Sequence, residues 1–284
     1  MTMEQLAAAA LEEDVGSGDV TSDFFVPETE QAQARLFAKE PGVVAGTAAA
    51  AEVFRQLDPA ARVRVVRADG AAVEKGDAIL EVEGSARTLL TGERTALNFL
   101  QRLSGVATLT RRYVEAVAGT GARVLDTRKT TPGWRLLEKA AVAAGGGTNH
   151  RIGLFDAVMV KDNHLLAESR LEALQRGIDA VKAAHPGMKV QLEADTLGQV
   201  RDFLGLRGVD ALLLDNMPCP ELREAVALAR ASGKSISLEA SGGVTLETIR
   251  AIAETGVDFI SVGALTHSAR ALDVSMEFTR VTLG

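Results

Sequence analysis

From residue 122 onward, the chain alternates short apolar runs, polar loops and longer stretches of helical spacing. Apolar residues three and four positions apart are typical of amphipathic helices, and short continuous apolar runs are typical of strands buried on both faces of a parallel sheet. The runs are ARVLD, AVMV, KVQLEA, ALLLD, SISLEA and DFISVG. Six such units predict a parallel α/β barrel of the TIM type, complete or incomplete, rather than an open doubly wound sheet.

The first part of the chain has a different pattern. We expect helices over residues 3–13 and 47–57, and a turn-rich loop over residues 15–22. Apolar spacing of three and four predicts two long helices over 85–105 and 106–119. Extended segments punctuated by turns are QARLFAKEPG, ARVRVVRADG and AILEVEG. This part therefore predicts a small mixed α/β sheet.

Composition narrows the classes of function. The chain has 31 Lys and Arg against 38 Asp and Glu, for a formal net charge of -7. Nonspecific nucleic-acid binding needs a broad basic surface, so we expect no nucleic-acid partner. The single cysteine, Cys219, is compatible with a reducing cytosol. The acidic N-terminal segment resembles neither a secretory signal nor a membrane span, so we expect a cytoplasmic protein without a membrane partner.

Cationic side chains are concentrated in three loops within this acidic chain. The loops are DTRKT (126–130), GGGTNHR (145–151) and KDNH (161–164). They bring Arg128, Lys129, His150, Arg151, Lys161 and His164 within 37 positions. A focused positive cleft suits a small polyanion that carries carboxylates or phosphates.

Polar residues also follow each predicted strand of the barrel. They are Asp126 with Arg128 and Lys129, Lys161 with Asp162, Glu193 with Asp195, Asp215 with Asn216, Glu239 with Ser241, and Gly263. A single polar residue in such a place is often a helix cap, and Asp195 and Asn216 fit that role as well as a catalytic one. Six in succession indicate the rim of an active site, because chemistry in α/β barrels collects at the carboxyl ends of strands.

These motifs resemble those of the quinolinate phosphoribosyltransferase family. The matching segments run in order along almost the entire chain: ERTALN (93–98), DTRKTTPG, GGGTNHR, KDNH, LEAD, LLLDN, EASGGV and SVGALTH. The resemblance implies transfer of a phosphoribosyl group from phosphoribosyl diphosphate to quinolinate, with loss of CO2 and diphosphate, to give nicotinate mononucleotide for NAD synthesis. Such an enzyme is a pentosyltransferase.

The resemblance also implies the architecture. An N-terminal open-faced α/β sandwich over residues 1–105, joined by 270–284, would precede an incomplete α/β barrel over 106–269. The implied assembly is a homodimer or a higher oligomer, with Arg94 reaching into the site of the neighbouring subunit. From its spacing alone, Arg94 is a solvated helix position beside Glu93, and only the resemblance gives it a role.

The resemblance assigns the remaining site residues. Those implied to surround quinolinate are Arg94, Arg128, His150, Arg151 and Lys161. Those implied to contact phosphoribosyl diphosphate are Lys129, Glu193, Asp215, Ser241, Gly242, Gly243, Gly263 and His267. Lys129, Glu193 and Asp215 would be catalytic, and Glu193 and Asp215 would hold Mg²⁺ directly or through water. The glycines precede a predicted helix, VTLETIRAIAE, whose N-terminus would hold the 5′-phosphate.

Some positions depart from the family pattern or carry no expected chemistry. Ala140 and Ala143 stand where the family has tyrosine and arginine, which argues against ligand contacts from their helix. Trp134 is expected to pack in the core or at its rim, or to narrow the pocket mouth. His185 is expected in an exposed turn, and the histidines and Cys219 lack zinc-ligand spacing.

Two other functions fit parts of the pattern. One is a non-carboxylating, pyrophosphorylase-like relative associated with molybdenum transport that uses another acceptor. Such proteins tend to lack KDNH, which is present here. The other is a regulatory barrel that only binds a phosphorylated metabolite. That alternative leaves Lys161, Glu193 and Asp215 without a function.

Overall fold

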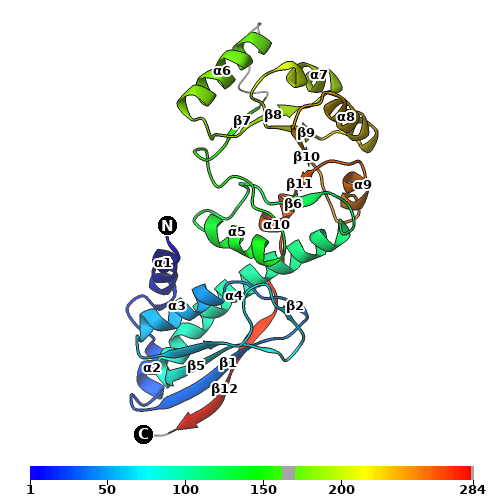
Figure 1. Cartoon of the computed structure of the whole chain (residues 1–284). Coiled ribbons are helices and arrows are strands. Elements are labelled where there is room, and N and C mark those ends of the chain that lie inside the picture. Colours follow the sequence, from blue (N-terminus) through cyan, green and yellow to red (C-terminus); the bar gives the residue numbers. More distant parts are fainter. Residues whose placement is uncertain (162–169, 283–284) are drawn as a thin grey trace. The chain divides into compact units, whose positions relative to one another are not determined.

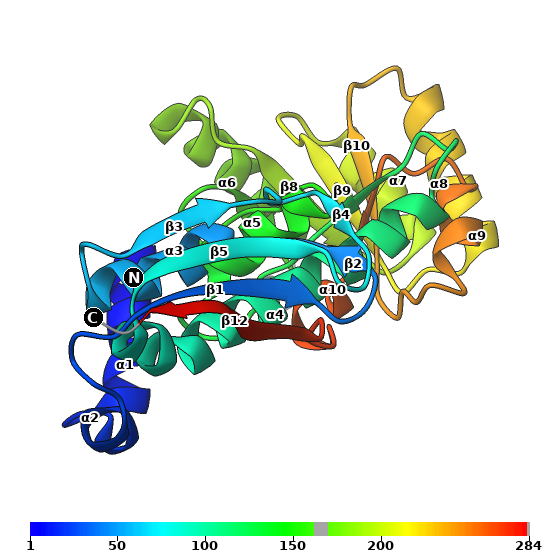
Figure 2. The same ribbon diagram turned by 90° about the horizontal axis from the view of Figure 1, so that it is seen from below.

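The chain forms two compact units. The computed structural model describes residues 1–161 and 170–282. The first unit comprises Met1–Arg111, Thr130–Gly146 and Leu265–Gly284, and the second comprises Arg112–Lys129 and Gly147–Ala264. Each unit is described below on its own, and Figures 1 and 2 show their elements.

The first unit is built on a four-stranded antiparallel sheet of order β12-β1-β5-β3. Its strands are β1 (Gln31–Ala38), β3 (Arg62–Val65), β5 (Ala78–Ser85) and β12 (Val274–Thr282), with a small pair β2 (Gly42–Val43) and β4 (Ala72–Val73) beside them. Its helices are α1 (Met3–Val15), α2 (Val20–Phe25), α3 (Thr47–Leu57), α4 (Ala86–Ala116), α5 (Arg135–Ala144) and α10 (Ala264–His267).

Alternation along β1 determines where the core of this unit lies. Ala32, Ala34, Leu36 and Ala38 are buried, and the residues between them are more exposed. Side chains alternate between the two faces of a strand, so these four share one face. Helices α1, α3 and α4 lie on that side of the sheet (Figures 1 and 2) and contribute Leu6, Phe54, Leu100 and other apolar residues to the same core cluster.

Several sequence-based expectations for this unit are confirmed. Helix α3 has the predicted bounds, and α1 extends the predicted helix by two residues. Trp134 packs as expected, because its ring stacks on Phe99 with 4.8 Å between the ring centroids. The prediction of a turn-rich loop over residues 15–22 is wrong in part, because helix α2 begins at Val20. Asp19 caps this helix, and its carboxylate accepts the N–H groups of Thr21 and Ser22.

The two predicted helices over 85–119 are one continuous helix, α4. Ser104 and Gly105 suggested a break in the helix. Instead, another segment of backbone packs closely against each of them. The Ser104 hydroxyl exchanges hydrogen bonds with the N–H and C=O of Ala45 at 3.0 and 3.1 Å. A Cβ at position 105 would lie 2.1 Å from the carbonyl oxygen of Arg270. A serine and a glycine are therefore used here for close contact and leave the helix intact.

The second unit is a six-stranded, all-parallel sheet of order β6-β11-β10-β9-β8-β7. The strands are β6 (Arg123–Leu125), β7 (Val158–Val160), β8 (Val190–Ala194), β9 (Ala211–Asp215), β10 (Ser237–Ser241) and β11 (Phe259–Ser261). Helices α6 (Arg170–Ala184), α7 (Leu197–Gly205), α8 (Cys219–Ala231) and α9 (Ile249–Ala253) lie on its outer side (Figure 1).

All six predicted strands of the barrel are confirmed. No hydrogen bonds pair β6 with β7 among the residues described, so the two stand at opposite ends of the strand order and the barrel is incomplete, as expected. One helix is shorter than predicted. The segment VTLETIRAIAE becomes helical only at Ile249, because residues 244–248 form turns in which Thr245 and Thr248 bond to each other.

Within the described parts of the chain, no helix combines the length and the apolar character needed to cross a membrane. The longest, α4, has 31 residues but carries arginines and glutamates along its length. His185 lies exposed after α6, as expected.

We predict that Gly105→Ala destabilises the protein although alanine is the better helix former. The new Cβ would meet the Arg270 carbonyl and lie 2.9 Å from the Cα of Ala271, and backbone cannot yield as a side chain does. A gain of about 1 kcal/mol in helix propensity is outweighed by overpacking, for a net loss of about 2 kcal/mol in the free energy of unfolding.

Gly177→Ala in α6 is the matched control, because no atom lies within 4 Å of its added Cβ. That variant should gain about 0.5–1 kcal/mol. Urea unfolding of both variants measures the difference. A Gly105→Ala protein as stable as wild type would contradict the close packing of the Arg270 segment on α4.

Candidate active site

The register of the parallel sheet brings polar side chains to one inner face. Glu193 of β8 is opposite Leu213 of β9, which is opposite Glu239 of β10. One step of two residues further along, Asp215 is opposite Ser241. Side chains two residues apart on a strand point to the same face. The two glutamates therefore share one face of the sheet with Asp215 and Ser241, which lie nearer its carboxyl edge.

A cavity of about 510 Å³ opens at this edge of the second unit. It is lined by Thr127, Arg128, Lys129, His150, Arg151, Met159, Lys161, Glu193, Leu213, Asp215, Asn216, Glu239, Ser241, Gly242, Gly243 and Ser261. Ten residues predicted from the sequence therefore line one cavity, although they come from separate loops and strands. We call it the carboxyl-edge pocket.

Other predicted residues lie elsewhere. Gly263 follows β11 but does not line the pocket. Arg94 is exposed on α4, and His267 is exposed at the end of α10, where its Nδ1 lies 2.6 Å from the hydroxyl of Ser268; both residues belong to the first unit. Asp162 and His164 lie outside the described residues. Asp195 and Asn216 are not helix caps, since Thr196 caps α7 and Pro218 precedes α8.

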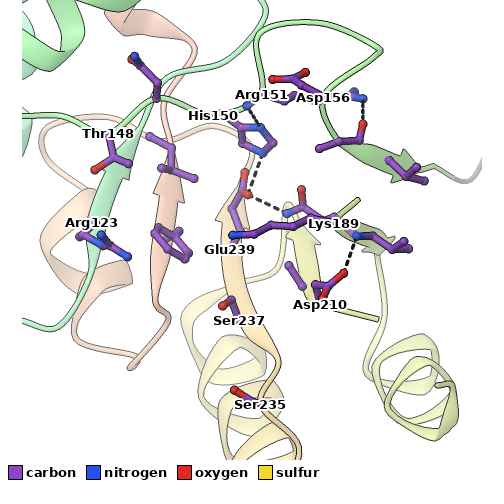
Figure 3. Close-up of a pocket in the computed structure, with 18 residues that line it drawn as sticks. Arg123, Thr148, His150, Arg151, Asp156, Lys189, Asp210, Ser235, Ser237 and Glu239 are labelled. Carbon is purple, nitrogen blue, oxygen red and sulfur yellow. Dashed lines mark hydrogen bonds and ion pairs between the residues drawn. The ribbon is translucent and has the colours of Figure 1, made fainter. Parts of the chain in front are cut away.

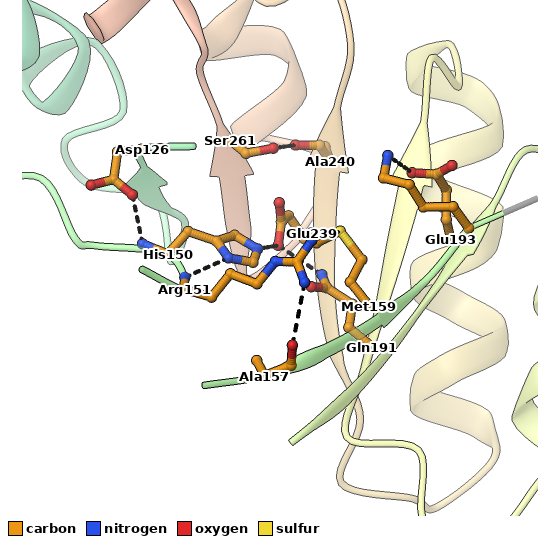
Figure 4. A network of polar contacts seen from close by, with 11 residues as sticks. Asp126, His150, Arg151, Ala157, Met159, Gln191, Glu193, Glu239, Ala240 and Ser261 are labelled. Carbon is orange, nitrogen blue, oxygen red and sulfur yellow. Dashed lines mark hydrogen bonds and ion pairs between the residues drawn. The ribbon is translucent and has the colours of Figure 1, made fainter. Parts of the chain in front are cut away.

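His150 is held at three points (Figure 4). Its backbone N–H donates to Oδ1 of the fully buried Asp126 at 2.7 Å. Its ring Nδ1 accepts the backbone N–H of Arg151 at 2.7 Å, and its ring Nε2 lies 3.1 Å from Oε2 of Glu239. Both ring nitrogens are thus engaged inside the protein, so the imidazole fixes the course of the chain between Asn149 and Arg151.

The Arg151 guanidinium occupies a place that disfavours its own charge. Its Nη1 donates to the carbonyl of Ala157 at 3.3 Å, and Nη2 contacts Sδ of Met159 at 3.5 Å. Burial lowers the pKa of Arg151, and repulsion from Arg128 lowers it further, against weaker opposing effects of Asp156 and Glu239. Two cations held against their mutual repulsion form a preorganised anion site.

Lys161 and Glu193 form an ion pair in the same pocket. Nζ of Lys161 lies 2.7 Å from Oε2 of Glu193, and the glutamate side chain is only 9% exposed while the lysine is 44% exposed. The resemblance assigned these residues to different ligands. In the ligand-free protein, each neutralises the other.

The loop after β10 has a backbone that requires glycine. Gly242 and Gly243 have φ of 98° and 58°, and a Cβ at Gly242 would lie 2.0 Å from Oδ1 of Asn216. Asn216 itself has a left-handed φ of 54°, and its amide donates to Asp215 Oδ2 at 2.6 Å. Since α9 begins only at Ile249, the backbone N–H groups beside the pocket here belong to this bend and not to a helix N-terminus.

Sequence reasoning placed Glu239 at the rim of the active site but assigned it no ligand, and the structure places it among the residues that line the pocket. It is 3% exposed, and its Oε2 also accepts the amide of Gln191 at 2.7 Å. Burial acts to raise the pKa of Glu239, but hydrogen bonds from His150 and Gln191 outweigh it, so the pKa lies below its usual value. The available signal was a glutamate inside the otherwise apolar run SISLEA, a costly placement without partners.

A second cavity, of about 620 Å³, lies toward the amino ends of the same strands (Figure 3). Its lining includes Arg123, Lys189, Asp210, Ser235 and Ser237. His150, Arg151 and Glu239 line both cavities, so they form the layer between them.

Family models match nearly the whole chain. Residues 19–104 match the N-terminal domain of quinolinate phosphoribosyl transferase, and residues 106–277 match its C-terminal domain. The chain belongs to the quinolinate phosphoribosyltransferase family. The pocket described above therefore lies in the part of the chain that matches the family's C-terminal domain.

Individual members of the family are similar along most of their length. A probable carboxylating nicotinate-nucleotide pyrophosphorylase of Bacillus subtilis is 44% identical over 94% of this chain and 90% of its own. The chloroplastic carboxylating enzyme of Arabidopsis thaliana is 43% identical over 94% of this chain and 80% of its own. The crystal structure of NadC from Streptococcus pyogenes superimposes with a TM-score of 0.89 at 40% identity, covering 99% of this chain and 96% of NadC.

We predict that Arg151→Met stabilises the ligand-free protein. Methionine keeps the apolar stem but removes a half-buried charge that Arg128 repels. The free energy of unfolding should rise by about 1 kcal/mol, as is common where a functional site stores strain.

Arg201→Met is the control, because Arg201 is exposed and paired with Glu224 on the surface. Its effect should stay within about 0.5 kcal/mol. Thermal and urea unfolding without ligands provide the comparison. A marked destabilisation by Arg151→Met would mean that the fold itself depends on this guanidinium.

Proposed function

We propose that this protein transfers the phosphoribosyl group of phosphoribosyl diphosphate to the ring nitrogen of quinolinate and releases CO2, yielding nicotinate mononucleotide and diphosphate. The observation that carries the proposal is the carboxyl-edge pocket, where Arg128, Lys129, Arg151 and Lys161 meet Glu193 and Asp215. Family membership and the carboxylating activity in the names of the similar proteins support the reaction.

Quinolinate fits the arginine side of the pocket. It is a pyridine that carries two neighbouring carboxylates, and a dianion relieves the repulsion between Arg151 and Arg128. Arginine offers the planar fork that matches a carboxylate, and Lys161 adds a compact charge. His150 contributes by holding the Arg151 backbone, since its ring nitrogens are already engaged.

Phosphoribosyl diphosphate fits the opposite side. Ser241, Gly242 and Gly243 line the pocket, both glycines have positive φ, and backbone N–H groups in such bends are suited to binding phosphates. Lys129 is exposed and lines the pocket, where its charge would stabilise the departing diphosphate. Gly263 and His267 stay part of this proposal by resemblance, at the turn after β11 and at the end of α10.

Mg²⁺ fits the same side as a companion of the diphosphate. Glu193 and Asp215 both line the pocket, and Mg²⁺ typically takes one or two carboxylates together with substrate phosphates and water. When bound, the ion would neutralise charge on the leaving diphosphate.

The protein's own contribution is orientation and electrostatic stabilisation. The ribosyl carbon loses diphosphate and becomes cationic, and the pyridine nitrogen supplies the electron pair of the new bond. Glu193 and Asp215 would stabilise that positive charge, and Lys129 the leaving negative charge. The nitrogen is then quaternary, so the ring accepts the electron pair freed when the adjacent carboxylate leaves as CO2, and a proton replaces that carboxylate.

An assembly of at least two copies is part of the proposal. Phe24 and Phe25 of α2 are 81% and 82% exposed, and Leu154 and Phe155 of the second unit are each 75% exposed. Apolar side chains in such clusters mark surfaces that another chain covers. The exposed Arg94 guanidinium has no hydrogen-bonding or ionic partner among the described residues, which suits a role in the pocket of a second copy. A cytoplasmic location stays a prediction from the single cysteine.

Incubation with quinolinate, phosphoribosyl diphosphate and Mg²⁺ tests the function, with nicotinate mononucleotide and CO2 as readouts. Two single variants test whether the two substrates bind to different sides of the pocket. Arg128→Ala should raise the KM for quinolinate by at least tenfold, and Lys129→Ala should raise mainly that for phosphoribosyl diphosphate, because loss of a charged contact costs about 1.5–3 kcal/mol.

Arg123→Ala is the control for charge, because Arg123 stacks on Phe259 and lines only the other cavity. Identical defects in Arg128→Ala and Lys129→Ala would contradict the division of the pocket. Product from another acceptor but none from quinolinate would select the non-carboxylating function.

Hybrid oligomers test the origin of Arg94. Arg94→Ala and Lys129→Ala chains should each be inactive alone. When they are coexpressed, one site of each mixed dimer would be intact if Arg94 acts across the interface, restoring about a quarter of wild-type activity under random pairing. Activity no greater than that of the separate variants would show that Arg94 acts within its own chain or not at all.

A further inference from the structure

We propose that Glu239 is a positioning residue that sets the tautomer of His150 and thereby the place of Arg151 in the pocket. This inference rests on the proposed function, because it assigns Glu239 to the quinolinate side of that site. Oε2 of Glu239, the atom that faces His150, would touch neither substrate.

The first step is the direction of the hydrogen bonds around His150. The backbone N–H of Arg151 can only donate, so the Nδ1 that it contacts at 2.7 Å carries a lone pair. The ring proton must then reside on Nε2, which faces Glu239 Oε2 at 3.1 Å. A carboxylate can only accept, so it requires this tautomer and excludes the other.

The second step is the burial of the carboxylate. Glu239 is 3% exposed, and its Oε2 accepts from both His150 and Gln191 (Figure 4). Its other oxygen, Oε1, is buried without a hydrogen-bond partner among the described residues. A carboxylate is costly in such a place; burial acts to raise the pKa of Glu239, and the contacts with His150 and Gln191 hold it below its usual value.

The third step connects this charge to Arg151. Glu239 is one of two carboxylates that favour the charged form of that guanidinium, against burial and Arg128. The same glutamate therefore acts on Arg151 twice: through space on its charge, and through His150 on its backbone. If Glu239 were replaced by a neutral group, only the Arg151 N–H would still favour this tautomer of His150, and Arg151 would lose part of its compensation.

Nitrogen-15 NMR of the histidine rings tests the tautomer without any activity. Four histidines are present, and His150→Gln identifies the signal of interest. In wild type, His150 should show an unprotonated Nδ1 and a protonated Nε2 at neutral pH. A protonated Nδ1 in the wild-type protein would overturn the proposal, whatever the variants do.

Glu239→Gln, which keeps the shape and removes the charge, tests the consequence. The His150 signal should shift toward a mixture of tautomers, and the KM for quinolinate should rise about 10- to 100-fold, as expected for the loss of a hydrogen bond to a charged group. The KM for phosphoribosyl diphosphate should change by less than about threefold, as expected for a residue outside that side of the pocket.

Ser237→Ala is the matched control, because Ser237 lies on the same face of β10 and lines only the other cavity. It should leave both KM values and the His150 signal unchanged. A folded Glu239→Gln protein with an unchanged quinolinate KM, or with both KM values raised equally, would refute the positioning role. A wild-type protein that forms no product would refute the proposed function, while the NMR result would still decide the tautomer.

Discussion

Repulsion between cations that share a half-buried pocket is the constraint on which the site depends. Arg151 lies where both burial and Arg128 disfavour its charge. Such an arrangement persists only if the backbone around it is fixed by other interactions. Asp126 and Glu239 provide them, since one carboxylate accepts the His150 N–H and the other faces the ring nitrogen. Buried anions thus hold exposed cations ready for a polyanionic ligand.

The sheet explains why these anions can be buried at all. The register of parallel strands β8, β9 and β10 places Gln191, Glu193 and Glu239 on one inner face of the sheet. In a closed barrel of this size, branched apolar side chains fill the interior. Here polar side chains occupy it, and cavities lie on both sides of the layer that contains Glu239.

Much of the fold could be predicted from the sequence because its strands are continuous apolar runs. All six barrel strands were found in this way, and α3 has the predicted bounds. Errors arose where tertiary contacts override local preference. Ser104 and Gly105 are typical of a helix break, but here they allow Ala45 and Arg270 to pack closely on a continuous helix. Likewise, the helix expected after Gly243 starts late because its threonines bond to each other.

The candidate site was predictable in its membership but not in its pairings. The family resemblance assigned Lys161 and Glu193 to the two ligands, yet no pattern in the sequence indicates that they bind each other at 2.7 Å. That pairing couples the two sides of the pocket. A dicarboxylate that takes Lys161 removes the partner of a glutamate that is only 9% exposed. Under the proposed function, Glu193 would then take a new positive charge or donor from the ribosyl substrate or its metal, so each ligand would favour the binding of the other.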